Sequence, residues 1–80
     1  MRATVLVRPK AGILDPQGQA VESSLQHLGF AVAEARVGRL VELQLATADE
    51  AQARAEVERM CEQLLANTII ENYAYELEAA

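Results

Sequence analysis

The sequence predicts one small α+β domain, in which two helices alternate with four extended segments. Apolar residues recur at helical spacing in two stretches, and β-branched or alternating residues fill the extended segments. Glycine, proline and asparagine stand at most of the boundaries between them. Residues 1–80 are too few for two domains, so we expect a single domain over the whole chain.

The first half of the chain begins with a predicted strand and a predicted helix. The aliphatic run 4–8 stops at Pro9, which cannot donate a hydrogen bond to a neighbouring strand. Asp15 before Pro16 is typical of a helix start, because the carboxylate accepts free amides and proline at the first position loses nothing. Gly29 suits the left-handed residue that ends a helix. The apolar stripe of this helix comprises Val21, Leu25 and Leu28.

The middle of the chain predicts a β-hairpin. Residues 30–37 alternate between larger side chains and small ones, as a strand does when its two faces differ. Gly38 and Arg39 indicate a tight turn. Residues 40–45 alternate again and predict the second strand of the hairpin.

The last part of the chain predicts the second helix and the final strand. Thr47 with Glu50 three residues later fits a capping box, and Asn67 can end the helix in a left-handed conformation. Residues 69–77 form the last strand. The apolar stripe of the helix comprises Ala53, Val57, Met60 and Leu64.

The order strand, helix, strand, strand, helix, strand favours a ferredoxin-like βαββαβ fold with a four-stranded antiparallel sheet. Right-handed crossovers would place both helices on one face of that sheet. We expect the other face to carry Val, Leu or Tyr and to need a cover. Because 15 of the apolar residues are alanine, the core is thin and the chain is expected to associate with itself.

Composition narrows the possible partners and sites. The net charge of −5 disfavours nucleic acid and anionic membranes, which are bound through cationic surfaces. No run approaches the roughly 18 apolar residues of a membrane span, so we expect a soluble cytoplasmic protein. The single Cys61 excludes an internal disulfide, and Cys61 with His27 is too little for a structural zinc site.

The charges are distributed unevenly along the chain. Residues 1–40 have a net charge of +2, whereas residues 41–80 have −7. The predicted topology gathers most of the cations at one end of the sheet, where an acidic partner surface could bind. We expect the partner interface to include Arg8, Lys10, Gly12, Asp15, Arg36, Arg39 and Asn67.

The residues predict no catalytic, cofactor or metal site. His27 lies opposite the apolar stripe of its helix and is expected in solvent, whereas Cys61 is expected as an inert core thiol. The segment 12–18 follows a strand and opens a helix, but it lacks the Gly-Lys-Ser/Thr ending of a phosphate loop. The helix N-terminus beside Lys10 could attract an anion, although Asp15 already occupies it as a cap.

Four stretches resemble the PurS family, the small accessory subunits of phosphoribosylformylglycinamidine synthase. They are Lys10-Ala11-Gly12-Ile13-Leu14-Asp15-Pro16-Gln17-Gly18, Leu28-Gly29-Phe30, Arg36-Val37-Gly38-Arg39 with Glu42-Leu43, and Leu64-Leu65-Ala66-Asn67 through Ile70-Glu71-Asn72-Tyr73. The match runs in order over nearly the whole chain. One departure is Thr68, where the family usually has proline after the asparagine.

The resemblance implies a subunit of de novo purine biosynthesis with no active site of its own. It implies a complex with a large ATP-dependent synthetase subunit and a glutaminase subunit, which together use ATP, Mg and glutamine. It also implies a dimer that bridges these subunits and helps ammonia pass between them. Two alternatives are a small-molecule-sensing ferredoxin-like module, which a ligand would stabilise, and a small enzyme active without partners.

Overall fold

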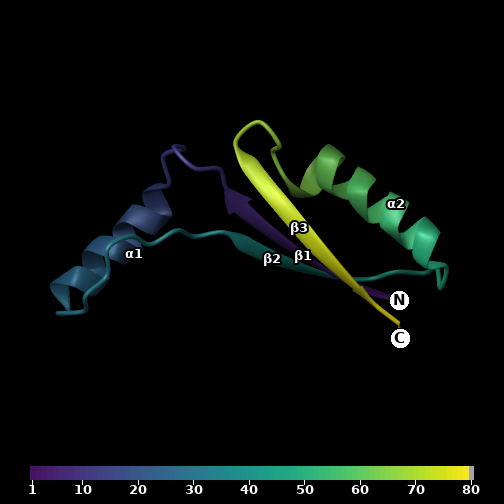
Figure 1. The fold of residues 1–80 in the computed structure, drawn as a ribbon, viewed down its shortest axis with the longest axis horizontal. Coiled ribbons are helices and arrows are strands. Elements are labelled where there is room, and N and C mark those ends of the chain that lie inside the picture. Colours follow the sequence, from purple (N-terminus) through teal and green to yellow (C-terminus); the bar gives the residue numbers. More distant parts are fainter. Residues whose placement is uncertain (80) are drawn as a thin grey trace.

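The computed structural model describes residues 1–79 and shows a three-stranded antiparallel sheet with one helix packed on it and one helix beyond its end (Figure 1). The strands are β1 (Arg2–Pro9), β2 (Arg39–Gln44) and β3 (Glu71–Glu78), in the order β2-β1-β3. The helices are α1 (Pro16–His27) and α2 (Glu50–Met60), and α2 continues into the π-helical turn η1 (Cys61–Leu65). The molecule is long and thin, 48 × 27 × 14 Å.

The central strand β1 carries the core. Its alternate residues Ala3, Val5 and Val7 are buried, since they point toward α2. Val5 lies opposite Val41 of β2 and Tyr75 of β3. The helix contributes the small residues Ala53, Val57 and Cys61, all fully buried. The core is therefore built from short side chains, as the alanine-rich composition predicts.

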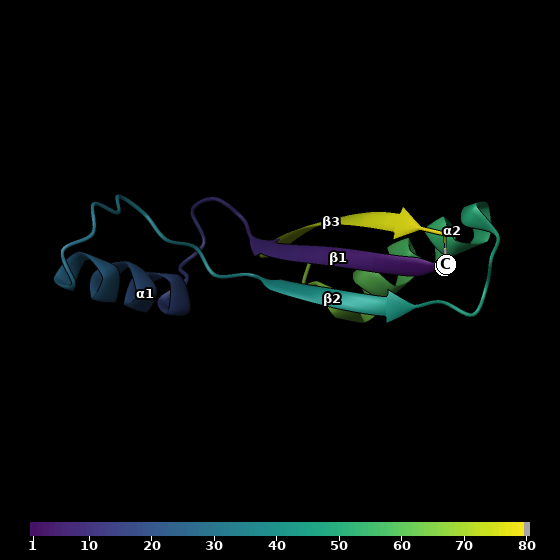
Figure 2. The same cartoon turned by 90° about the horizontal axis from the view of Figure 1, so that it is seen from below.

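The α+β class is confirmed, but the four-stranded sheet is wrong for this chain. Residues 30–37 lie beside α1 without forming a strand (Figure 2). They bend at Ala33, and residues 34–37 then run extended into β2 with no turn between them. Gly38 serves a different purpose from a hairpin turn: a Cβ there would lie 2.2 Å from the carbonyl oxygen of Val7. Because glycine has no Cβ, the chain can pass close to the β1 backbone at this point, just before β2 begins.

The prediction that both helices cover one sheet face is also wrong. α1 stands off the end of the sheet beside residues 30–37, as both views show (Figures 1 and 2). Its start agrees with the sequence, because the Asp15 side chain accepts from the Gly18 amide and Pro16 opens the helix. Gly29 follows α1 with a φ of 95°, the predicted left-handed conformation.

The caps of the second helix differ from the predicted ones. Asp49 is the N-cap and accepts from the Ala51 amide at 3.1 Å, whereas Thr47 Oγ1 accepts from the Asp49 amide. The helix ends in a π turn, with the Ala66 amide bonded to the Cys61 carbonyl at 3.0 Å. Asn67 is not left-handed, since no residue other than glycine among those described has a positive φ.

The sheet face opposite α2 is more polar than predicted. Valine and tyrosine lie on the α2 side, and the far face has Leu6 and Leu40 as its large apolar residues. The most exposed large apolar side chains lie outside the sheet face. They are Leu14, Leu28, Phe30, Leu64 and Ile69.

Candidate functional site

The predicted interface residues lie where three segments meet at one end of the sheet. These segments are residues 8–15 after β1, residues 36–40 leading into β2, and residues 65–71 before β3. The Lys10 amide donates to the Ile70 carbonyl at 2.9 Å, which joins the first segment to the third. Arg36 joins the first segment to the second, and Arg39 joins the second to the third.

Asp15 fastens α1 to the extended segment. One carboxylate oxygen accepts from the Gly18 amide at 3.1 Å and the other accepts from the Val37 amide at 2.8 Å. Arg36 Nε lies 3.9 Å from the same carboxylate. The hydrogen bond donated by the Val37 amide is the largest cause of the lowered pKa of Asp15, and the hydrogen bond from the Gly18 amide is the next. Asp15 is thus both a helix cap and a tertiary contact.

Arg36 holds the loop after β1. Its Nη2 donates to the Lys10 carbonyl at 2.9 Å and to the Ile13 carbonyl at 3.4 Å. Its Nη1 lies 3.4 Å from the carboxylate of Glu34. Because the guanidinium already binds these oxygens, Arg36 mainly holds the loop in place. It adds little positive charge that a partner could bind.

Arg39 is committed in the same way to Glu71. Its two terminal nitrogens bond the two carboxylate oxygens at 2.7 and 3.0 Å, a bidentate pair, and it also donates to the Leu65 carbonyl. The Asn67 amide donates to the same carboxylate at 2.8 Å. The bond from Arg39 is the main cause that lowers the pKa of Glu71. Asn67 therefore enters this site through its backbone.

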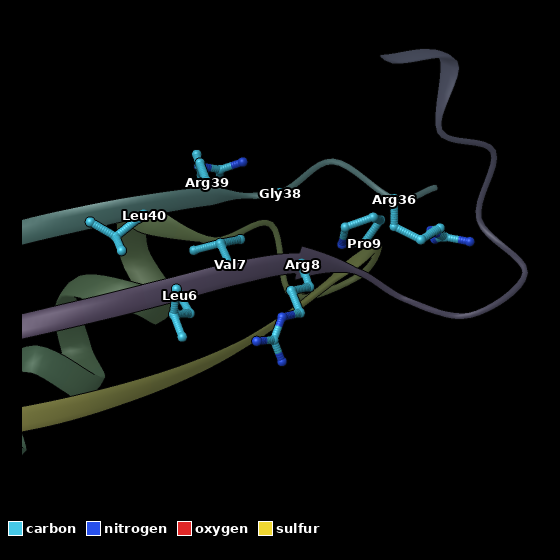
Figure 3. A pocket seen from close by; sticks show the side chains of 8 residues that line it. All are labelled: Leu6, Val7, Arg8, Pro9, Arg36, Gly38, Arg39 and Leu40. Atoms are coloured by element: carbon cyan, nitrogen blue, oxygen red, sulfur yellow. The ribbon is translucent and has the colours of Figure 1, made fainter. Parts of the chain in front are cut away.

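Two cations at this end remain available. Within residues 1–79, the side chains of Arg8 and Lys10 make no hydrogen bond or ion pair. Arg8 borders an open hollow of about 410 Å³ between β1 and the start of β2 (Figure 3). Figure 3 shows Leu6 and Arg8 on one side of β1 and Val7 on the other. The hollow is lined by Leu6, Val7, Arg8, Pro9, Arg36, Gly38, Arg39 and Leu40.

Sequence reasoning missed Glu71, Glu22 and the contact at Gly18. Glu22 accepts from the Ala35 amide at 3.1 Å, and a Cβ at Gly18 would lie 2.6 Å from the Ala35 carbonyl oxygen. A local sequence pattern cannot predict these contacts, because the two residues of each contact lie far apart in the sequence. Gly12 has a φ of 82° in the exposed loop and touches nothing at its Cβ position.

The remaining reactive side chains lie apart. His27 is exposed at the end of α1, and Cys61 is fully buried, where burial raises the pKa of its thiol. Among residues 1–79, no group of three or more histidine, cysteine, aspartate or glutamate side chains is placed to hold a metal ion. None of the helices described is long and apolar enough to cross a membrane.

Comparison with known proteins identifies the family. The sequence profile of PurS, described as phosphoribosylformylglycinamidine (FGAM) synthase, matches residues 2–79. The chain belongs to the PurS family. It is 49% identical over 79 residues to the FGAM synthase subunit PurS of Synechocystis, covering 98% of this chain and 77% of that one. As a PurS-family chain, it is a subunit of FGAM synthase, a ligase complex of purine biosynthesis.

Solved structures agree with this assignment. The PurS of Methanocaldococcus jannaschii, a subunit of formylglycinamide ribonucleotide amidotransferase in the purine biosynthetic pathway, superposes with a TM-score of 0.85 at 34% identity. That match covers 99% of this chain and 96% of the other. A chain in the PurLQS structure of Thermotoga maritima gives a TM-score of 0.85 at 26% identity, covering 94% and 93%. The PurS fold thus extends over almost all of this chain.

Proposed function

We propose that this subunit bridges the large synthetase subunit and the glutaminase subunit of FGAM synthase and supports ammonia transfer between them. The likeness to a chain of a PurLQS assembly carries the proposal. The polar residues at the end of the sheet support it, because Asp15, Arg36, Arg39 and Glu71 are tied to one another or to backbone groups. Such groups hold a shape and are poorly suited to exchanging protons with a substrate.

The chemistry then belongs to the other subunits, which use ATP, Mg and glutamine in the cytoplasm. The test is reconstitution of glutamine-dependent FGAM synthesis from the three purified subunits. Activity should depend on this chain, and the pair without it should lose coupled use of glutamine. Equal glutamine-dependent synthesis in its absence would contradict the proposal.

Within the proposed interface, Arg8 and Lys10 are the residues that can attract an acidic partner, since Arg36 and Arg39 are already paired. Arg8→Glu with Lys10→Glu should weaken assembly with the synthetase, most strongly at low salt. The matched control is Arg2→Glu with Arg59→Glu, which changes charge equally at two other exposed arginines. Equal affinities of the two double variants at low ionic strength would contradict this assignment.

We also propose that the chain self-associates. Leu28 and Phe30 at the end of α1 are 73% and 60% exposed, and Val41 and Leu43 on the α2 side of β2 are only half-buried. Apolar surface of this kind gains roughly 25 cal/mol per Å² when another chain covers it. Sedimentation should find a dimer or larger assembly at micromolar concentration. A folded monomer there would overturn this proposal.

A further inference from the structure

The strand β3 is long and regular, and its outer edge is unprotected. The strand order places β3 at a border of the sheet, where it pairs with β1 at every position from Glu71 to Glu78 (Figures 1 and 2). Exposed edges are usually blunted by proline, by lysine or by a bulge. β3 contains no proline, lysine or glycine, and its unbroken register with β1 leaves no bulge. Its outer edge can therefore accept another strand.

Two hydrogen bonds fix which amides of β3 face outward. The Lys10 amide donates to the Ile70 carbonyl at 2.9 Å, so these two residues are a hydrogen-bonded pair beside the start of β3. Bonded and non-bonded pairs alternate along antiparallel strands, so the even positions of β3 bond to β1 and the odd positions face away. The bond of 2.8 Å from the Leu45 amide to the Met1 carbonyl agrees, since it turns the odd positions of β1 toward β2. The outward amides of β3 are those of Tyr73, Tyr75 and Leu77.

These three amides donate no hydrogen bond within residues 1–79, and carboxylates lie beside them on both faces of the sheet. Glu76 is exposed on the face opposite α2 and has no ion pair among the described residues. On the α2 side, Glu58 accepts from the Tyr75 hydroxyl at 2.8 Å. Arg54 lies over the Tyr75 ring, but it already pairs with Glu50 at 3.4 Å. The edge is therefore complementary to a positively charged strand.

We propose that the outer edge of β3 binds an extended, basic segment of the glutaminase subunit, which adds a strand to the sheet. This inference rests on the proposed bridging function and names a surface for it. Arg8 and Lys10 are assigned to the synthetase, so a chain that joins two subunits needs a second surface of different character. The added strand would bond the outward amides and carbonyls and would place basic side chains opposite Glu76.

The same charges disfavour a second copy of this chain at this edge. β3 contains three glutamates and no basic residue. Two copies of β3 side by side would crowd the carboxylates of Glu76 and Glu78 on one face, and like charges across strands destabilise a sheet. The glutamates thus reject an acidic strand and admit a basic one, which gives the edge its specificity.

Proline at position 77 tests the hydrogen bonds of the edge. Leu77→Pro removes an outward amide and leaves the bonds from β3 to β1 in place, and a border strand tolerates proline at such a position. Leu77→Ala is the matched control, because it shortens the same side chain and keeps the amide. The dissociation constant of the chain for the purified glutaminase subunit should be about tenfold higher with proline than with alanine, since a partner carbonyl loses its donor.

Equal dissociation constants for the proline and alanine variants would overturn the inference. Failure of the glutaminase subunit to bind the unmodified chain would overturn it as well. The same holds if Leu77→Pro weakens binding to the synthetase and leaves binding to the glutaminase unchanged. Circular dichroism and the Tm establish that both variants are folded.

A charge change gives a second test that does not alter the backbone. Glu76→Lys should raise the dissociation constant for the glutaminase roughly fivefold at low salt, and less at high salt. Glu56→Lys is the matched control, because Glu56 accepts a hydrogen bond from Gln52 of its own helix and lies outside β3. The same dissociation constant for both lysine variants would contradict a basic partner segment at β3.

Reconstituted FGAM synthesis separates this inference from the bridging function. At limiting concentrations of this chain, Leu77→Pro should support less glutamine-dependent synthesis than Leu77→Ala. If synthesis requires the chain but the two variants support it equally, bridging stands and β3 is not the surface. If synthesis does not require the chain at all, the bridging function is wrong and this inference falls with it.

Discussion

The guanidinium of Arg39 binds both carboxylate oxygens of Glu71, at 2.7 and 3.0 Å, across 32 positions of the sequence. The same carboxylate accepts the Asn67 amide, so one side chain joins the start of β2 to the turn before β3. This contact fixes the end of the sheet that forms the proposed docking surface.

Glu71→Gln should lower the Tm, because an amide cannot offer two anionic oxygens to Arg39 and an acceptor to Asn67 at once. Glu76→Gln in the same strand removes an equal charge from an exposed side chain with no ion-pair partner among the described residues. Thermal unfolding followed by circular dichroism compares the two. A drop in Tm of equal size in both variants would show that the pair contributes only its charge.

Acid should destabilise the protein through Asp15 and Glu71. Both carboxyls have a pKa below their ordinary values of 3.8 and 4.5 when folded. A carboxyl whose pKa is lower in the folded state stabilises the folded protein at pH values above its ordinary pKa. This stabilisation is lost as the pH falls from the ordinary pKa to the pKa of the folded state. Urea unfolding should therefore show stability falling below about pH 4.5. Asp15→Asn should flatten this dependence, and an unchanged slope would contradict the assignment.

Local signals predicted the parts of the fold that depend on near neighbours. Asp15 caps α1, Gly29 is left-handed and Cys61 is core, because each role is decided within a few residues or by an apolar stripe. The failed predictions depend on distant contacts. Gly38 looks like a turn, yet its missing Cβ admits the Val7 carbonyl, which no sequence spacing indicates.

In the candidate site, too, the sequence predicted what depends on near neighbours and missed what depends on distant contacts. The family motifs fall on the three segments that meet at this end of the sheet, but they could not distinguish Arg8, which has no hydrogen bond or ion pair among the described residues, from Arg39, which is paired with Glu71. That distinction depends on the register of β1 with β2 and β3. The location of α1 off the sheet depends on contacts of Gly18 and Glu22 with residue 35 that a hydrophobic pattern does not encode.

The phenol of Tyr73 should lose its proton at a higher pH than an ordinary tyrosine. The carboxylate of Glu62, together with burial, raises the pKa of Tyr73 to about 12. In a Tyr75→Phe background, Tyr73 is the sole tyrosine, and its ionisation can be followed by ultraviolet absorbance with circular dichroism as a check on folding. Adding Glu62→Gln should move the midpoint toward the ordinary value of 10.0. An unchanged midpoint would contradict the assignment of the raised pKa to Glu62.

Val57 should be far more sensitive to truncation than Val21. Val57 is fully buried between α2 and the sheet, whereas Val21 on α1 is 42% exposed. Val57→Ala removes buried methyl groups and leaves a cavity, which should cost about 2 kcal/mol of unfolding free energy in urea titrations. Val21→Ala should cost clearly less. Equal losses would contradict the placement of the core between α2 and β1.

Gly18→Ala sets two opposing effects against each other. Within a helix, alanine is favoured over glycine by about 1 kcal/mol, so an uncrowded site would be stabilised. At Gly18 the added Cβ would lie 2.6 Å from the Ala35 carbonyl oxygen and would also collide with the Asp15 carboxylate. Overpacking of this kind costs about 1 to 3 kcal/mol, and a backbone carbonyl cannot move aside as a flexible side chain can.

We therefore expect Gly18→Ala to lower the free energy of unfolding, because the clash exceeds the gain in helix propensity. Gln19→Ala is the matched control, since Gln19 is the next residue of α1, is exposed and gains helix propensity without any contact. Urea unfolding should separate the two variants in opposite directions. If both variants are stabilised, α1 does not pack against residue 35.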